Sequence, residues 1–266
     1  MKFSIITINY NNRDGLEMTI KSVLGQTYKN IEYIIIDGGS TDGSIEVIKK
    51  YAAQIDYWVS EADKGIYNAM NKGIKKASGD FLNFMNSGDA YHSSSSLETI
   101  AGLHSDADII IGGYYETGRG VAHVIPQQEI TLLTLMKYTI NHQASFYKRE
   151  LFNKKLYDEN YIIMADAKLN FQSIILDNCS VKITDCIVSD YDTNGISSNY
   201  DIYKAEREKF LCELFPPRIL RDYEAMYNTD EVPLVSLLPQ LKESPTIQRW
   251  VYKLASFLIK IKNNRK

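Results

Sequence analysis

The sequence predicts an α/β fold in which a mainly parallel sheet carries helices on both faces, followed by a C-terminal helical extension. Within the first 86 residues, short apolar runs alternate with segments of helical periodicity, which is typical of βαβ units. Each apolar run ends abruptly in a polar turn. After residue 200 the pattern is helical and is interrupted by prolines. We therefore expect one sheet domain over residues 1–200 and a helical extension over residues 201–266.

Four strands and three helices are expected to alternate in the first half of the chain. The continuous β-branched run FSIITI predicts a strand over 3–8, and the apolar spacing that follows predicts a helix that ends at Gly25. A second strand over 31–36 leads through a glycine-rich turn into a helix from Ser44 to about Tyr51. A strand over 55–61, a helix over 65–80 and a strand over 81–86 complete the alternation.

The second half is less regular. Apolar runs predict a strand over 107–116, a helix over 130–139 and a strand that enters a helix over 143–152. A further helix is expected to begin near Ala165. Residues 179–192 fit either a pair of strands or one long bent strand.

Polar segments follow each of the first four strands. In parallel sheets, ligands bind outside the carboxyl ends of the strands. The topology therefore predicts that residues 9–12, 37–44, 61–65 and 86–89 meet around one site.

Composition narrows the class of protein. The chain has 266 residues, 44% of them hydrophobic, and a formal net charge of −3, so no nucleic-acid partner is expected. Its three cysteines are too few for a disulfide framework or a zinc site. The first residues do not resemble a signal peptide, and no run approaches the roughly 20 apolar residues of a membrane span. A cytoplasmic protein is expected.

Two carboxylates at the ends of predicted strands are candidates for binding a ligand or a metal. The run DGGSTDGS lacks the spacing of a dinucleotide fingerprint and of a Walker loop. Its first residue, Asp37, suits a hydrogen bond to a base or ribose, although a tight turn explains it equally well. Asp89 suits Mg²⁺ or Mn²⁺ if a diphosphate supplies further ligands, and the alternative is a cap for a helix starting near 93–96.

The order of motifs resembles the inverting GT-A glycosyltransferases of family two, in particular bacterial enzymes of surface-polysaccharide assembly. The resemblance covers roughly residues 2–200, so that the first domain would be the catalytic one. The matching segments are FSIITINYNN, YIIIDGGSTDGS, EADKGIYNAMNKGIKKASGDFLNFMNSGD and NHQASFYKRELF.

The resemblance implies roles for individual residues. Asp166, at the expected helix start in YIIMADAKLNF, would be the catalytic base, whereas on its own it would be read as a carboxylate favoured by the helix dipole. His142 and Gln143 match an acceptor-side feature, and the alternative is the polar end of a buried strand. The residues implied in nucleotide binding are Thr7, Asn9, Tyr10, Asp37, Asp63, Gly65, Asn71 and Ser87.

The metal site departs from the family pattern. Asp89 would bind the metal directly, but Gly88 stands where many members carry a second carboxylate. Met70 stands where many have arginine, which leaves the diphosphate charge to the metal, backbone N–H groups and Lys64. The segment DYDTNGISSN would close over the diphosphate through N–H groups at Gly195–Ser197, with Asp190 or Asp192 as a further ligand.

The implied function is transfer of one sugar from a nucleotide diphosphate donor to a hydroxyl of a glycan or lipid-linked acceptor in polysaccharide biosynthesis. A UDP-sugar is the default donor, and GDP- and dTDP-sugars stay open. The alternative is a catalytically inactive nucleotide-sugar-binding module, which the departures at Gly88 and Met70 favour and Asp166 opposes. A sugar nucleotidyltransferase is disfavoured, because no basic glycine-rich triphosphate loop occurs near the N-terminus.

The C-terminal segment is basic and amphipathic. Residues 244–266 hold six Lys or Arg and no acid. Trp250 and Tyr252 suit the boundary between water and lipid. We expect this helix to lie on an anionic membrane surface at the inner face of the cytoplasmic membrane, the alternative being that its stripe packs on the catalytic domain. The apolar stripe comprises Ile247, Trp250, Val251, Leu254, Phe257, Leu258 and Ile261.

Overall fold

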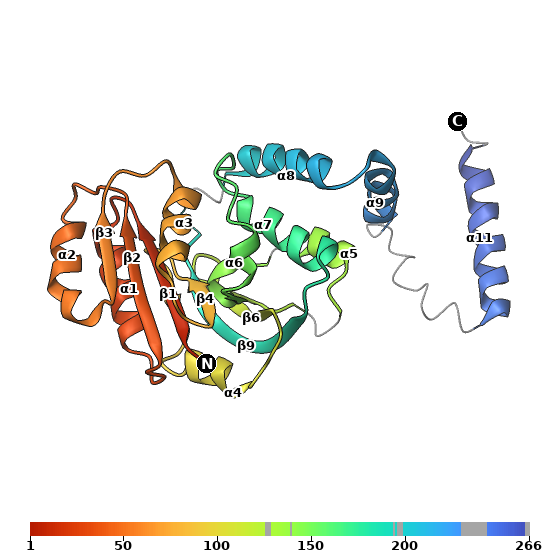
Figure 1. The fold of residues 1–266 in the computed structure, drawn as a ribbon. Coiled ribbons are helices and arrows are strands. Elements are labelled where there is room, and N and C mark those ends of the chain that lie inside the picture. Colours follow the sequence, from red (N-terminus) through yellow and green to blue (C-terminus); the bar gives the residue numbers. More distant parts are fainter. Residues whose placement is uncertain (126–128, 139, 194, 196–198, 230–243, 264–266) are drawn as a thin grey trace. The chain divides into compact units, whose positions relative to one another are not determined.

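The structure is a computed structural model that describes residues 1–125, 129–138, 140–193, 195, 199–229 and 244–263. The chain divides into two compact units, Met1–Leu214 and Phe215–Lys266 (Figure 1). The predicted functional division at residue 200 stays a prediction. Side chains at 226–229 and 258–263 are outside the description, as are residues 196 and 197 of the predicted diphosphate loop.

The first unit is built on a nine-stranded sheet in the order β3-β2-β1-β4-β8-β6-β9-β5, with β7 paired to β6. The first four strands are parallel, β8 is antiparallel to both β4 and β6, and β9 runs parallel to β6. The predicted α/β fold class is confirmed. The strands are β1 (Phe3–Asn9), β2 (Ile31–Asp37), β3 (Tyr57–Ser60), β4 (Phe81–Phe84), β5 (Ala90–Tyr91), β6 (Ile109–Glu116), β7 (Val121–His123), β8 (Ser145–Lys148) and β9 (Val181–Tyr191).

Alternation of strand side chains places helices on both faces of the parallel strands. Phe3, Ile5 and Ile35 share one buried cluster with Leu16 of α1 (Arg13–Leu24) and Val47 of α2 (Ser44–Tyr51). A short 3₁₀ turn, η1 (Ala52–Gln54), follows α2.

The opposite face receives α3 (Ile66–Lys76). A Cβ at Gly73 would lie 2.5 Å from Cγ2 of Ile6, so this glycine permits the close approach of helix and sheet. The helix thereby brings its N-terminal end to the polar edge of the sheet.

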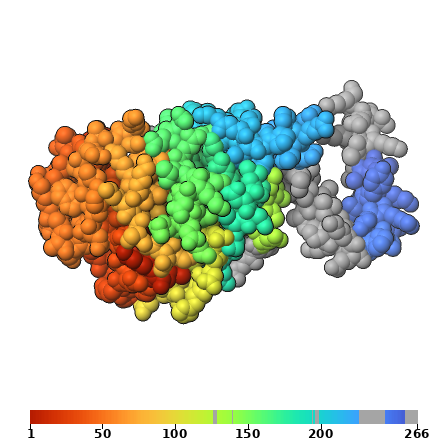
Figure 2. Space-filling view, viewed as in Figure 1, coloured from red at the N-terminus to blue at the C-terminus, as the bar shows by residue number. Residues whose placement is uncertain are grey.

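Within this unit, the green segment of the second half lies against the orange segment of the first half in Figure 2. Within the predicted range 179–192, residues Val181–Tyr191 form the single bent strand β9, whose register shifts relative to β6 near Gly113. The short strands β5 and β7 were not predicted, whereas α4 begins where a helix near residues 93–96 was considered. The remaining helices are α4 (Ser96–Gly102), α5 (Leu132–Lys137), η2 (His142–Ala144), α6 (Leu151–Lys154), α7 (Ala165–Asn170), the π-helix η3 (Phe171–Leu176), α8 (Tyr200–Leu214), α9 (Pro217–Thr229) and α11 (Pro245–Asn263).

Candidate active site

A cavity of about 1110 Å³ lies at the carboxyl ends of the parallel strands. Three of the four predicted polar segments line it, including Asn9, Asp63 and Asp89. The fourth segment, residues 37–44, lies behind Asn9, whose side chain donates a hydrogen bond to Asp37 over 2.7 Å. The predicted convergence at this sheet edge is therefore observed.

Most of the implied nucleotide residues line the cavity. Tyr10 is 67% exposed, so its ring is open to a planar ligand. Asp63 accepts a hydrogen bond from the backbone N–H of Gly65 over 2.9 Å and closes the turn that opens α3. Gly65 has φ of +114° with no atom within 4 Å of an added Cβ, so backbone conformation alone favours glycine there. Asn9 and Ser87 complete this set.

Thr7, Asp37 and Asn71 are buried and do not line the cavity, and their implied roles in nucleotide binding stay predictions. Thr7 is fully buried, and its hydroxyl donates to the Met85 carbonyl over 2.7 Å. The Asn71 amide donates to the Tyr157 carbonyl and accepts from the Tyr157 N–H, at 2.9 and 3.0 Å. Both side chains therefore hold backbone segments beside the cavity.

Asp37 organises the turn after β2. Its carboxylate accepts hydrogen bonds from the hydroxyls of Ser40 and Ser60, each over 2.6 Å. Burial disfavours its charge, but these bonds and the one from Asn9 outweigh burial and hold the pKa of Asp37 below its ordinary value. Gly39 has φ of +82°, as the tight-turn interpretation predicts.

Asp89 is buried in the cavity wall, with 5% of its surface exposed. It accepts hydrogen bonds from the Gln143 side-chain amide over 2.7 Å and from the Asp192 N–H over 3.0 Å. Burial raises the pKa of Asp89 to about 6, although both bonds act in the opposite direction. The helix-cap alternative is wrong, because Ser95 occupies the N-cap position of α4.

Asp166 lies in the first turn of α7 and lines the same cavity. Its Oδ1 accepts a hydrogen bond from the Tyr67 hydroxyl over 2.9 Å and another from the N–H of Ala167, also over 2.9 Å. Its Oδ2 lies 2.8 Å from Nδ1 of His142, and Nε2 of His142 lies 3.0 Å from the Asn86 amide nitrogen. The carboxylate therefore both faces the cavity and occupies a helix start.

Tyr67 is a site residue that the sequence analysis missed. Burial and then the charge of Asp166 raise the pKa of Tyr67 well above its ordinary value. The phenol consequently stays a hydrogen-bond donor. It follows Ile66 at the start of α3, outside the apolar stripe, and a tyrosine beside a predicted sheet-edge turn was the only sequence signal for it.

Glu206 of α8 was also missed. Its carboxylate accepts hydrogen bonds from the backbone N–H groups of Ile162, Ile163 and Met164, over 2.5, 2.9 and 3.1 Å. Met164 is the N-cap of α7 and makes no side-chain capping bond of its own. Glu206 therefore holds the segment that leads directly into Asp166.

The residues present fit a divalent metal that also binds a diphosphate. In the described ranges, no three His, Cys, Asp or Glu side chains cluster to hold a metal. Asp89 and Asp192 nevertheless both line the cavity. Mg²⁺ commonly takes one or two carboxylates and completes its octahedron with water and substrate phosphates.

Comparison with known proteins identifies the class. One similar solved structure is S. aureus TarS 1-349 in complex with UDP-GlcNAc, which is 22% identical to this chain with a TM-score of 0.65. The match covers 77% of this chain and 64% of the TarS chain, so this chain spans less than two thirds of TarS 1-349. Mannosyltransferase PcManGT from Pyrobaculum calidifontis, in complex with GDP-Man and Mn²⁺, is 12% identical with a TM-score of 0.64, over 98% and 80% of the two chains. The fold is that of GT-A-type glycosyltransferases.

The family model described as "Glycosyl transferase family 2" matches residues 4–175 of this chain. An uncharacterised glycosyltransferase of Mycobacterium tuberculosis is 33% identical over 204 residues, which cover 74% of this chain and 77% of that protein. The chain belongs to glycosyl transferase family 2, and the predicted resemblance is confirmed.

Proposed function

We propose that the protein is an inverting hexosyltransferase that moves a sugar from a nucleotide diphosphate donor to a hydroxyl of a glycan or lipid-linked acceptor in polysaccharide biosynthesis. The observation that carries the proposal is the Asp166 carboxylate, fixed by Tyr67 and His142 in the same cavity as Asn9 and Tyr10. A UDP-sugar is the expected donor, in line with the UDP-GlcNAc complex of TarS. GDP- and dTDP-sugars stay open.

Asp166 would take the proton of the acceptor hydroxyl as the bond to the diphosphate breaks. The hydrogen bonds from Tyr67 and from the Ala167 N–H restrain one carboxylate oxygen, and His142 restrains the other. A base restrained in this way loses little entropy when the acceptor arrives. His142 also contacts Asn86 and so links the base to the segment that carries Asp89.

The leaving diphosphate needs positive charge or hydrogen-bond donors. Asp89, with Ser87 beside it, would hold Mg²⁺ or Mn²⁺, which would offset the developing charge. Met70 is fully buried and contributes nothing there, and Lys64 does not line the cavity. Among the described lining residues, Arg119 is the only Lys or Arg, and its side chain is 75% exposed beside Glu116.

Asp166→Asn tests the proposal against the alternative of an inactive nucleotide-sugar-binding module. We expect release of nucleotide diphosphate to fall by orders of magnitude while donor affinity stays close to wild type, as for an interaction made chiefly in the transition state. Asp14→Asn is the matched control, because Asp14 is an exposed aspartate in the first turn of α1. Donor binding without turnover in the wild-type chain would support the binding module.

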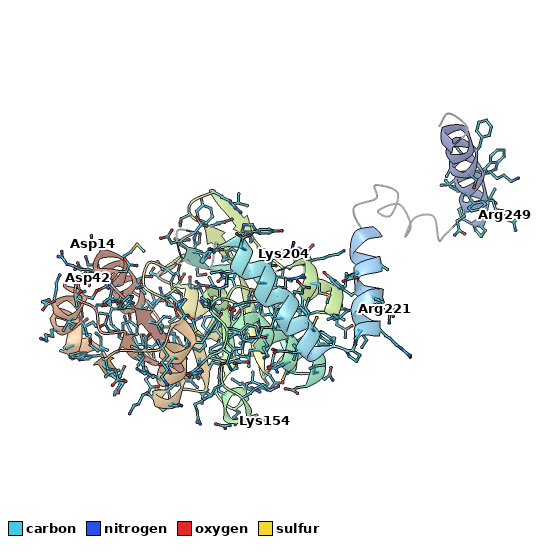
Figure 3. All side chains as sticks on the ribbon, turned by 90° about the horizontal axis from the view of Figure 1, so that it is seen from above. Asp14, Asp42, Lys154, Lys204, Arg221 and Arg249 are labelled. Atoms are coloured by element: carbon cyan, nitrogen blue, oxygen red, sulfur yellow. The ribbon has the colours of Figure 1, made fainter. Side chains whose placement is uncertain are left out.

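We also propose that α11 lies on an anionic membrane surface. Trp250, Tyr252, Leu254 and Phe257 are each more than 60% exposed, and Arg249 projects from the same helix (Figure 3). Basic residues near anionic lipid contribute about 1 kcal/mol each. No helix in the described part of the chain is long and apolar enough to cross a membrane.

Vesicle flotation tests the membrane proposal. The full chain should float with anionic vesicles at low salt and be released at high salt, whereas a chain ending at Glu243 should not float. The full-length double variant Trp250→Ser with Phe257→Ser should also fail to float, while Lys204→Gln on α8 should behave as wild type. If wild type stays unbound at low salt, α11 is a packing element.

A further inference from the structure

We propose that Asp192, in the segment that follows β9, supplies the second carboxylate of the metal and diphosphate site, in place of the one absent at Gly88. The inference rests on the proposed function, because it names a further residue of that site. Of the two aspartates considered for this segment, the structure favours Asp192.

The backbone at Gly88 does not suit a side chain. Its φ is +103°, which L-amino acids rarely adopt. A Cβ built there would lie 3.3 Å from the amide nitrogen of Asn12 and 3.8 Å from Oδ2 of Asp192. The Asp192 carboxylate therefore lies beside the point where a side chain at position 88 would start.

Asp192 is coupled to Asp89 by the main chain. Its N–H donates to Oδ1 of Asp89 over 3.0 Å, and both residues line the cavity. A cation that binds between two neighbouring carboxylates interacts favourably with both.

Gln143 gives an independent indication of a ligand. Its side-chain amide nitrogen holds Oδ2 of Asp89, while its Oε1 is buried and has no hydrogen-bond partner within the described structure. Gln143 is 2% exposed and lines the cavity. A buried carbonyl oxygen without a partner requires an explanation, and oxygen atoms are the ligands that Mg²⁺ and Mn²⁺ prefer.

Asp190 does not share this environment. Its Oδ1 lies 2.6 Å from Nδ1 of His92, its backbone pairs with Ala90 across β5 and β9, and it does not line the cavity. The same strand end therefore offers a matched control, two residues away and identical in chemistry.

The test measures binding of Mn²⁺ and UDP to the full chain by calorimetry and by electron paramagnetic resonance of free Mn²⁺. Wild type should bind Mn²⁺ weakly alone and more tightly with UDP, since the two ligands are linked reciprocally. With UDP present, Asp192→Asn should lower Mn²⁺ affinity by roughly tenfold or more, a loss typical of altered metal coordination. Asp190→Asn should match wild type, and Asp192→Glu should retain part of the affinity.

A second readout separates a metal ligand from a structural residue. In EDTA, Asp192→Asn should bind UDP as tightly as wild type or more tightly, because one negative charge beside the diphosphate is removed. The N–H donated to Asp89 is unchanged by this substitution. Mn²⁺ affinity equal to wild type, or weaker UDP binding in EDTA, would overturn the proposal. Failure of the proposed function would look different: wild type would bind Mn²⁺ and UDP but release no nucleotide from any donor sugar.

Discussion

Replacing Glu206 by alanine should destabilise the protein and slow turnover, although Glu206 is not expected to touch substrate. The substitution removes the acceptor of three backbone N–H groups, and Ile163 and Met164 are buried residues. A buried donor left without a partner costs about 1–3 kcal/mol. Water can reach Ile162 more easily, because its side chain is half exposed. Two uncompensated donors therefore lower the free energy of unfolding by about 4 kcal/mol at mid-range.

A loss of that size lowers the melting temperature by roughly 8–16 °C, at about 2–4 °C per kcal/mol for a domain of this length. Calorimetry measures it, and steady-state kinetics should show kcat falling more than the donor KM, because the segment before Asp166 loses its anchor. Glu206→Gln keeps one acceptor oxygen, so its melting temperature and kcat should lie between those of wild type and Glu206→Ala. Glu208→Ala, an exposed glutamate on the same helix, is the control. If Glu206→Ala melts and turns over like Glu208→Ala, the proposed anchoring of α7 by Glu206 is refuted.

Three further predictions concern Asp89, Gly73 and Tyr67. The pKa of Asp89 is raised to about 6 from its ordinary 3.8, so the metal-free fold should lose stability as the pH rises from about 4 through 6, measured by urea unfolding. Over the same range Mn²⁺ affinity should rise, because metal and proton compete for the carboxylate. Gly73→Ala should cost about 1–3 kcal/mol of stability through overpacking against Ile6, whereas Gly102→Ala, with open space around it, should not. Tyr67→Phe should lower kcat with little change in donor KM, and an unchanged kcat would remove Tyr67 from the support of Asp166.

The parallel half of the fold was predictable because its strands are continuous apolar runs. Such runs are buried on both faces, and their polar ends must meet at one edge of the sheet. The sequence did not predict how far below that edge an individual polar side chain lies. Thr7 lies only two residues before the end of β1, yet its hydroxyl faces the Met85 carbonyl and not the cavity. Asn71 lies on a helix near the site, but its amide binds the 157–159 segment.

Partners that are far apart in sequence were the least predictable part of the site. Glu206 lies among exposed charged residues on α8, and only its spacing of four from the buried Phe210 indicates that it faces inward. Sequence spacing likewise gives no sign that Gln143 binds Asp89, 54 residues away. Its placement beside Asp89 follows from the antiparallel return of β8 next to β4.

Each of the two central carboxylates, Asp89 and Asp166, is held by residues from the other half of the sheet domain. Asp89 belongs to the parallel half of the sheet but is held by Gln143 and Asp192 from the second half. Asp166 belongs to the second half but is held by Tyr67 from the first. Each carboxylate therefore reaches its observed position only when both halves are packed together. A parallel half alone would leave Asp89 without the two donors that hold it, so metal binding and base catalysis should depend on the same packing and be lost together when it loosens.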